Sequence, residues 1–161
     1  MAIYMQFDGG NVKGDVTAKG FENWIEISSL QFGLHRAITM DAGRAANRSH
    51  GRPSISDITL AKPQCKASPF LLKASLTGDQ GKKAKIVVVE TGAKQLKTYV
   101  EYDLEDVLIG SYNTSTSGDT PHETISLSFT KITTTFTNSS RDNTQGSPVR
   151  VTYDVSTAVP A

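Results

Sequence analysis

The feature that most constrains this fold is an alternation of apolar and polar residues that recurs along the chain. It is clearest near the end, where Val149, Val151, Tyr153 and Val155 are separated by polar residues. Successive side chains of a strand point to opposite faces, so this period of two predicts a strand with one apolar face. Other β-rich segments, alternating or β-branched, predict strands over residues 2–7, 24–38, 54–60, 85–90, 96–109 and 124–137.

The alternation changes phase inside two of these segments. In residues 24–38 the apolar positions are odd before Ser28 and even after Ser29, and a second change follows Thr130. A β-bulge adds one residue to a strand and shifts its phase by one, whereas a turn between two strands would give the same pattern. We favour a bulge at both places because neither carries Gly, Pro, Asn or Asp. Bulged strands bend, as the strands of a small barrel must.

One short segment departs from the β pattern and predicts a helix that ends at Gly78. Ser68 is a suitable N-cap, Pro69 suits the first helical position, and glycine suits the C-terminal stop. Leu72 and Leu76 lie one turn apart, with Ser75 beside them, so we expect that face to pack on the sheet. The predicted fold is therefore mainly β: a small closed β-barrel of two packed sheets with one short flanking α-helix, in a single domain over residues 1–161.

Two stretches and the tail predict loops. Residues 40–53 have no period and carry arginines, which predicts an extended loop. We favour a contact with another protein over a disordered loop in solvent, because arginine is well suited to interfaces. Residues 138–148 are polar throughout and predict a mobile loop, and residues 157–161 form the expected tail.

Charge and composition exclude several classes of protein. The chain has 17 Lys and Arg against 16 Asp and Glu, a net charge of +1, which gives no argument for a nucleic acid or a membrane as partner. The single cysteine, Cys65, cannot form an intrachain disulfide. The N-terminus has no basic segment followed by a long apolar run, so we expect no secretory signal peptide. No stretch reaches the roughly 20 apolar residues of a membrane helix.

No residue pattern points to catalysis, a metal or a cofactor. The three histidines, His35, His50 and His122, have no metal-ligand spacing, and Cys65 has no histidine nearby in sequence. The fold could still bring Cys65 to a histidine, which keeps an enzyme as a third class. The acidic cluster of residues 101–106 places alternate carboxylates on one strand face, which is typical of a solvated surface. We therefore expect no catalytic, cofactor-binding or metal-binding residue.

A series of short motifs runs along nearly the whole chain. They are MAIYMQFDG at the N-terminus, Val12-Lys13-Gly14-Asp15, Ile25-Glu26-Ile27, Leu30-Gln31-Phe32-Gly33, Lys62, Ala67-Ser68-Pro69, Thr77-Gly78, Tyr99, and Leu104 through Ile109. In their order and spacing, these motifs resemble the haemolysin-coregulated protein (Hcp) family of the type VI secretion system. The chain departs from the family at Cys65, in residues 40–53 and at the C-terminus.

The resemblance implies a structural protein that forms hexameric rings, and these rings stack into the expelled inner tube. It implies a contractile sheath, a spike protein and small effector proteins as partners, with effectors carried or chaperoned in the ring lumen. It also implies assembly in the bacterial cytoplasm and export by the secretion machine. A monomeric β-barrel module that binds a peptide or a carbohydrate is the alternative.

Two surfaces follow from the strand pattern and this resemblance together. Leu30, Phe32 and Leu34 should face the core, which turns Gln31, Gly33 and His35 outward; the resemblance places that face on the lumen. We expect residues 40–53 to project from one ring face and dock on the next ring. The residues predicted to make those contacts are Arg44, Asn47, Arg48, His50 and Arg52.

Overall fold

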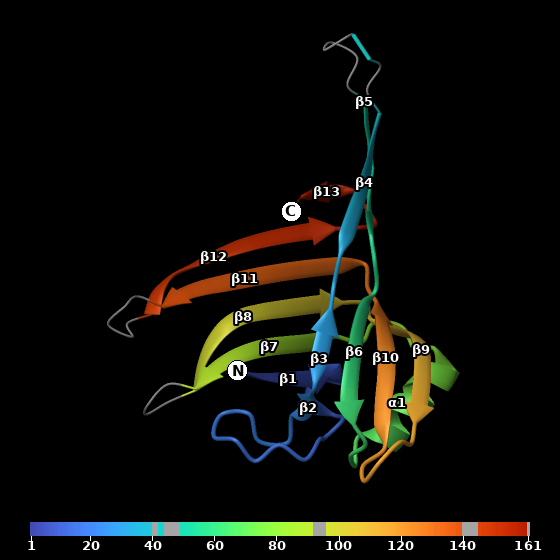
Figure 1. The fold of residues 1–161 in the computed structure, drawn as a ribbon, viewed down its shortest axis with the longest axis vertical. Helices are drawn as coiled ribbons and strands as arrows, with labels where there is room; N and C mark the ends of the chain where they lie inside the picture. The colour runs from blue at the N-terminus through green and yellow to red at the C-terminus, as the bar shows by residue number, and fades with distance from the viewer. Residues whose placement is uncertain (40–41, 44–48, 92–95, 140–144, 161) are drawn as a thin grey trace.

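Two antiparallel β-sheets pack against each other, and a β-hairpin projects beyond them (Figure 1). The computed structural model describes residues 1–39, 42–43, 49–91, 96–139 and 145–160. The seven-stranded sheet has the order β13 (Val159–Pro160), β12 (Gln145–Asp154), β11 (Lys131–Ser139), β8 (Leu96–Glu105), β7 (Ala84–Thr91), β1 (Ala2–Phe7) and β2 (Ile25–Ile27).

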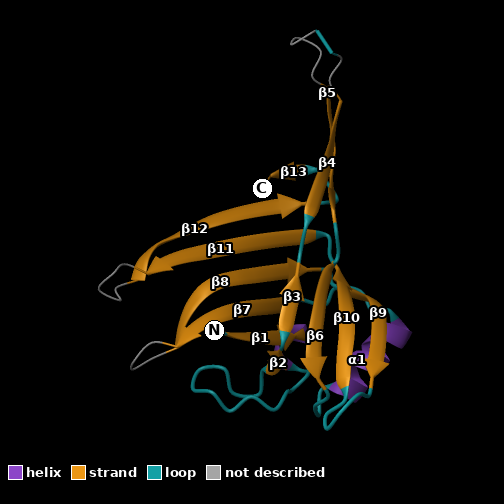
Figure 2. Ribbon diagram, viewed as in Figure 1, coloured by secondary structure: helices purple, strands orange, loops and turns teal. Residues whose placement is uncertain are grey.

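The four-stranded sheet has the order β3 (Ser29–Gln31), β6 (Ile58–Pro63), β10 (His122–Ser128) and β9 (Leu108–Ser115). β4 (Leu34–Thr39) and β5 (Ser49–Ile55) form the projecting hairpin. A short 3₁₀ helix, η1 (Asp8–Gly10), follows β1, and α1 (Ser68–Thr77) flanks the four-stranded sheet beside β9. Figure 2 shows that the strands of the two sheets run crosswise.

The core lies between the two sheets. Apolar residues of both sheets and of α1 fill it, and the core residues without exposed surface include Met5, Ile25, Ile58, Leu60, Leu71, Ile86, Ile125 and Leu127. Burial of these side chains is the main favourable contribution to folding, at about 25 cal/mol per Å² of apolar surface. This arrangement confirms the predicted mainly β fold of two packed sheets with a flanking helix.

The phase changes at Ser28 and Thr130 mark places where the chain leaves one sheet and enters the other. β2 pairs with β1 in the seven-stranded sheet, whereas β3 pairs with β6 in the four-stranded sheet. At the crossing, the Ser28 N–H donates to the carbonyl of Ala61 at 2.7 Å. β10 and β11 are related in the same way across Thr130. The predicted bulges within continuous strands are therefore wrong. The apolar residues change parity because each sheet presents its own inner face to the shared core.

The helix exists where predicted, but its cap and its buried face differ from the prediction. Ala67 occupies the N-cap position, and the Ser68 hydroxyl makes no capping hydrogen bond. Leu71 is fully buried, while Leu72 and Leu76 are 42% and 79% exposed. The predicted face is therefore wrong by about a third of a turn. The C-terminal stop is confirmed, because Gly78 adopts the left-handed conformation with φ of 61°.

The loops are shorter than predicted. Residues 49–53 belong to β5, and the predicted loop over 138–148 contributes residues to the ends of β11 and β12. Residues of the predicted tail form β13, which pairs with β12. Leu34, predicted to face the core, is 67% exposed because it lies in the hairpin beyond the packed sheets.

Candidate assembly surfaces

The outer face of the four-stranded sheet is a surface of small, uncharged side chains, which we call the polar wall. Its members alternate with buried residues such as Leu60 and Ile125, so they point away from the core. Strand register aligns them in two rows across the sheet, Gln31, Thr59, Ser126 and Ser111 in one and Ser29, Ala61, Thr124 and Asn113 in the other. None of these eight residues carries a charge.

The structure places the three predicted lumen residues in different parts of the chain. Gln31 lies in β3, on the polar wall; Gly33 lies between β3 and β4; and His35 lies in β4, opposite Ser54. All three are exposed. The sequence prediction missed the partners of Gln31 on the other strands. Their signal was the polar residues that alternate with apolar ones in residues 58–61 and 124–127.

A hydrogen-bonded clasp between Gly33 and Ser56 fixes the point where the hairpin leaves the sheet. The Gly33 N–H donates to the Ser56 hydroxyl at 3.1 Å, and that hydroxyl donates to the Gly33 carbonyl at 2.7 Å. The Ser56 N–H donates to the same carbonyl at 3.0 Å. Three hydrogen bonds between two exposed residues hold the two strands of the hairpin together at its base.

Two of the residues predicted to stack rings, His50 and Arg52, belong to this hairpin. Arg52 is exposed in β5, and the backbone of His50 pairs with that of Ile38 in β4. Arg44, Asn47 and Arg48 lie outside the described residues. Residues 49–53 of the predicted loop thus belong to a strand, because β4 and β5 satisfy each other's backbone hydrogen bonds as they leave the sheets.

A buried polar network joins the four-stranded sheet to α1. Lys62 Nζ lies 2.5 Å from Glu123 Oε2, and neither side chain is exposed. The Ser68 hydroxyl donates to the same carboxylate at 2.9 Å, and the Tyr112 hydroxyl donates to Glu123 Oε1 at 2.7 Å. Lys62 also donates to the Pro63 carbonyl at 3.0 Å. Residues of β6, β9, β10 and α1 therefore meet at one carboxylate.

The environment of this network shifts two pKa values in opposite directions. Burial and the Glu123 hydrogen bond raise the pKa of Tyr112 to about 12. Burial also acts to raise the pKa of Glu123, but the hydrogen bonds from Lys62, Tyr112 and Ser68 outweigh it and lower that pKa. Glu123 is therefore held as a carboxylate and Tyr112 as a neutral phenol at neutral pH.

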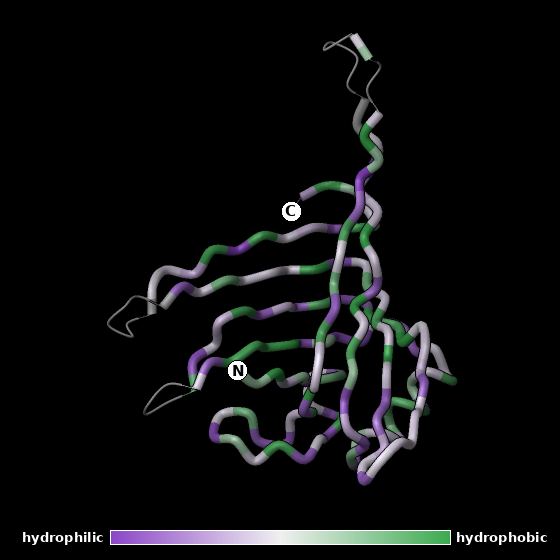
Figure 3. Tube along the Cα trace, in the orientation of Figure 1, coloured by the Kyte–Doolittle hydropathy of each residue, from purple (hydrophilic) through white to green (hydrophobic). Residues whose placement is uncertain are grey.

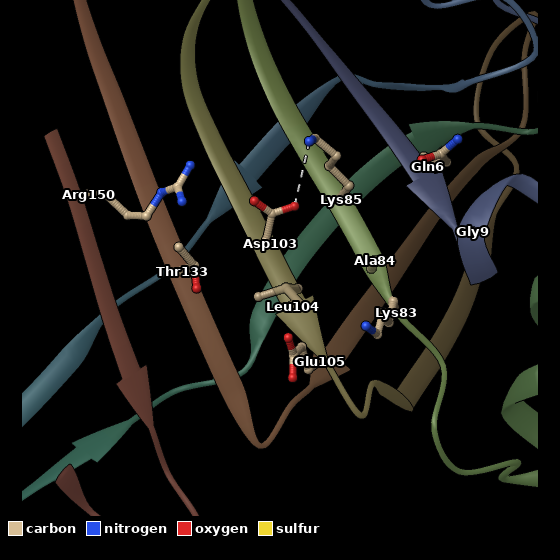
Figure 4. Close-up of a pocket in the computed structure, with 10 residues that line it drawn as sticks. All are labelled: Gln6, Gly9, Lys83, Ala84, Lys85, Asp103, Leu104, Glu105, Thr133 and Arg150. Atoms are coloured by element: carbon tan, nitrogen blue, oxygen red, sulfur yellow. Dashed lines mark ion pairs between the residues drawn. The ribbon is translucent and has the colours of Figure 1, made fainter. Parts of the chain in front are cut away.

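The outer face of the seven-stranded sheet is charged, in contrast to the polar wall. Lys85 Nζ lies 2.8 Å from Glu101 and 3.7 Å from Asp103. Lys85 and Asp103 line a hollow on this face, and Arg150 approaches that hollow from β12 (Figure 4). The hollow has a volume of about 390 Å³. Burial and the neighbouring Glu101 raise the pKa of Asp103. Of the acidic strand face predicted to be solvated, Glu105 is exposed, whereas Glu101 and Asp103 are partly buried and pair with Lys85.

The described residues hold no group of three or more His, Cys, Asp or Glu side chains placed to bind a metal ion. Cys65 is half-buried against the core, and its N–H donates to the Ser68 hydroxyl at 3.0 Å. Within the part of the chain that the structure describes, no helix is long and apolar enough to span a membrane.

Comparison with known proteins agrees with this architecture. A family model described as "Type VI secretion system effector, Hcp" matches residues 4–136. The chain belongs to the Hcp family. It is 25% identical to protein hcp1 of Pseudomonas aeruginosa over 158 residues, which cover 96% of both chains. As a member of this family, it is a structural component of the type VI secretion tube.

Solved structures share the whole fold of this Hcp-family chain. A structure described as a type six secretion system protein superposes with a TM-score of 0.88 at 20% identity and covers 99% of both chains. Hcp1 from Salmonella typhimurium gives a TM-score of 0.78 at 22% identity and covers 99% of this chain and 98% of its own. At these identities the likeness shows the fold alone.

Proposed function

We propose that six copies of this Hcp-family chain form a ring whose channel is lined by the polar wall, and that stacked rings carry or chaperone small effector proteins. The polar wall carries this proposal. A channel that passes different proteins must not bind one charge strongly, and the eight wall residues are uncharged. The charged outer face of the seven-stranded sheet would attract and repel cargo according to charge.

The β4–β5 hairpin is the proposed contact between successive rings. It extends beyond both sheets, and its base is fixed by the Gly33–Ser56 clasp, so its direction is set by the fold (Figure 1). Arg52 is exposed on it and can pair with acidic groups or carbonyls of the next ring. Deletion of residues 43–51 should leave rings intact and abolish tubes; unchanged tubes would contradict this role.

The proposed role is structural, without catalysis or a cofactor. The ring stacks inside a contractile sheath and beneath a spike protein, and contraction expels it. Replacing Cys65 with alanine should therefore leave assembly and export unchanged. Loss of export in a correctly folded Cys65→Ala variant would favour a chemical role for the thiol.

Electron microscopy of the purified protein tests the assembly, and a matched pair of variants tests the channel. We expect sixfold rings with a central hole, whereas a monomer at every concentration would favour a binding module. Thr59→Lys adds a charge to the polar wall, and Thr133→Lys adds the same charge to the outer face of the seven-stranded sheet. Effector co-purification should fall only for Thr59→Lys. If both variants form rings and co-purify equal amounts of effector, the polar wall does not line the channel.

A further inference from the structure

The inner face of β11 and β12 is apolar but only partly covered. Val149 and Val151 are each 64% exposed, although they lie on the same side of the sheet as the buried Ile132. Their neighbours on the opposite face, Arg150 and Thr152, are polar. This alternation is typical of a strand with one face packed, yet in the described structure the four-stranded sheet ends before it reaches this part of β12 (Figures 1 and 3).

A groove lies between this uncovered face and the hairpin. Its volume is about 320 Å³, and Arg36 is the one charged residue among those that line it. The lining residues are Phe32, Leu34, Arg36, Pro53, Ile55, Ile132, Thr134, Val151, Tyr153 and Pro160. An occupant of this groove must therefore be apolar, with a negative group beside it.

The exposed strip of α1 has these properties. Leu72 and Leu76 lie one turn apart and are 42% and 79% exposed. The last turn of α1 contains no basic residue, and Asp79 follows the Gly78 cap. The helix C-terminus carries a partial negative charge, to which Asp79 adds a full one. The strip thus combines apolar side chains with negative charge at one end, complementary to a groove whose charge is Arg36.

The two surfaces lie at opposite edges of the four-stranded sheet. Phe32, in the groove, directly follows edge strand β3, whereas α1 packs beside β9, the other edge strand. One chain cannot bring its own helix strip into its own groove across the width of that sheet. Two copies placed side by side in the same orientation can bring the strip of one to the groove of the other. Such a head-to-tail contact repeats from copy to copy, and it forms a ring when the rotation between neighbouring copies closes.

We propose that the groove of each chain receives the Leu72–Leu76 strip of the next copy, with Arg36 facing the helix C-terminus and Asp79. This inference rests on the proposed ring and assigns its subunit contact. The contact covers Val151 and Leu76 together, which accounts for apolar side chains that are exposed in the single chain.

Disulfide crosslinking tests the contact directly. In a Cys65→Ala background, each chain carries Leu76→Cys together with Val151→Cys. Mild oxidation should give a ladder of up to six linked chains on a non-reducing gel. The matched control pairs Leu76→Cys with Arg150→Cys, which lies next to residue 151 but on the opposite face of the sheet, and should stay a single-chain band.

The outcomes separate this inference from the proposed function. Rings without a ladder, or an equal ladder from the control pair, would overturn the contact and leave the ring in place. A monomer in light scattering would overturn both.

Variants that introduce opposite charges at the two proposed contact positions provide a second test, read as the affinity between subunits. Leu76→Glu and Val151→Lys alter exposed residues, and each should raise the ring dissociation constant by about tenfold or more. The double variant places glutamate against lysine at every contact and should regain most of the lost affinity. Additive losses in the double variant would contradict the pairing of these two residues.

Discussion

Lys62 and Glu123 form a fully buried ion pair, with Nζ and Oε2 2.5 Å apart. The pair connects adjacent strands β6 and β10, and Ser68 ties it to the first turn of α1. Removing one partner leaves an uncompensated charge in the core, whereas replacing both with apolar residues removes the charges together. The helix strip proposed to contact the next copy is thus positioned by this network.

Lys62→Met should lower the free energy of unfolding by about 3–5 kcal/mol because Glu123 loses its main partner. The double variant Lys62→Met with Glu123→Leu should be clearly more stable than Lys62→Met alone. Lys66→Met breaks the exposed pair with Asp15 and should cost less than about 1 kcal/mol. Urea unfolding at one protein concentration compares the four proteins, and equal losses for both lysines would contradict the argument.

Tyr112 should make stability fall at alkaline pH. Its pKa is raised in the folded state to about 12, above the value of about 10 expected in the unfolded chain. Its contribution is therefore fully present below pH 10 and is lost as the pH rises through about 12. Unfolding free energies measured from pH 8 upward should decline more steeply for the native chain than for Tyr112→Phe. Parallel pH profiles would show that Tyr112 keeps its ordinary pKa.

Gly14 should not tolerate a side chain. A Cβ at this position would lie 2.2 Å from the Trp24 carbonyl oxygen, and the Gly14 N–H donates to the Asn23 carbonyl at 2.8 Å. Gly14→Ala should destabilise the protein by about 3 kcal/mol as the loop moves apart. Gly33→Ala is the matched control, since its nearest neighbour is the Ser56 hydroxyl at 3.7 Å. A thermal melt in which the two alanine variants behave alike would disprove the steric explanation.

Ser56→Ala should loosen the base of the hairpin. It removes the hydroxyl that both donates to and accepts from Gly33, at a cost of about 1 kcal/mol. We expect the Gly33 amide to exchange with deuterium faster and tube formation to decline more than ring formation. Ser54→Ala, at an exposed position two residues earlier in β5, should change neither. Unchanged Gly33 exchange in Ser56→Ala would show that the clasp does not hold the hairpin.

The sequence predicted the β class and the helix, because alternation and the glycine stop at Gly78 are local signals. It could not predict where the chain changes sheet, since a crossing at Ser28 and a bulge give the same phase change. The helix face was mistaken for a related reason. Leu72 and Leu76 have the spacing of core residues, and the sequence does not distinguish a face buried in the chain from one left exposed.

The candidate site was predictable only in part. Gln31 was placed outward by alternation within its own segment, but Thr59, Ser126 and Ser111 join it through pairing between distant strands. The buried Lys62–Glu123 pair was not predicted, because lysine and glutamate are almost always exposed and these two lie 61 residues apart.

The pairing of β1 with β7 has a consequence for how the chain folds. Ala2 lies opposite Val89, so the first strand has no neighbour on that side until more than half of the chain has been synthesised. The apolar strand β7 also lacks its second pairing partner until β8 has been synthesised. Sheets built from such distant pairs fold slowly, on the order of milliseconds to seconds, and expose unpaired apolar edges in the meantime. Newly made chains should therefore depend on chaperones until β8 is in place.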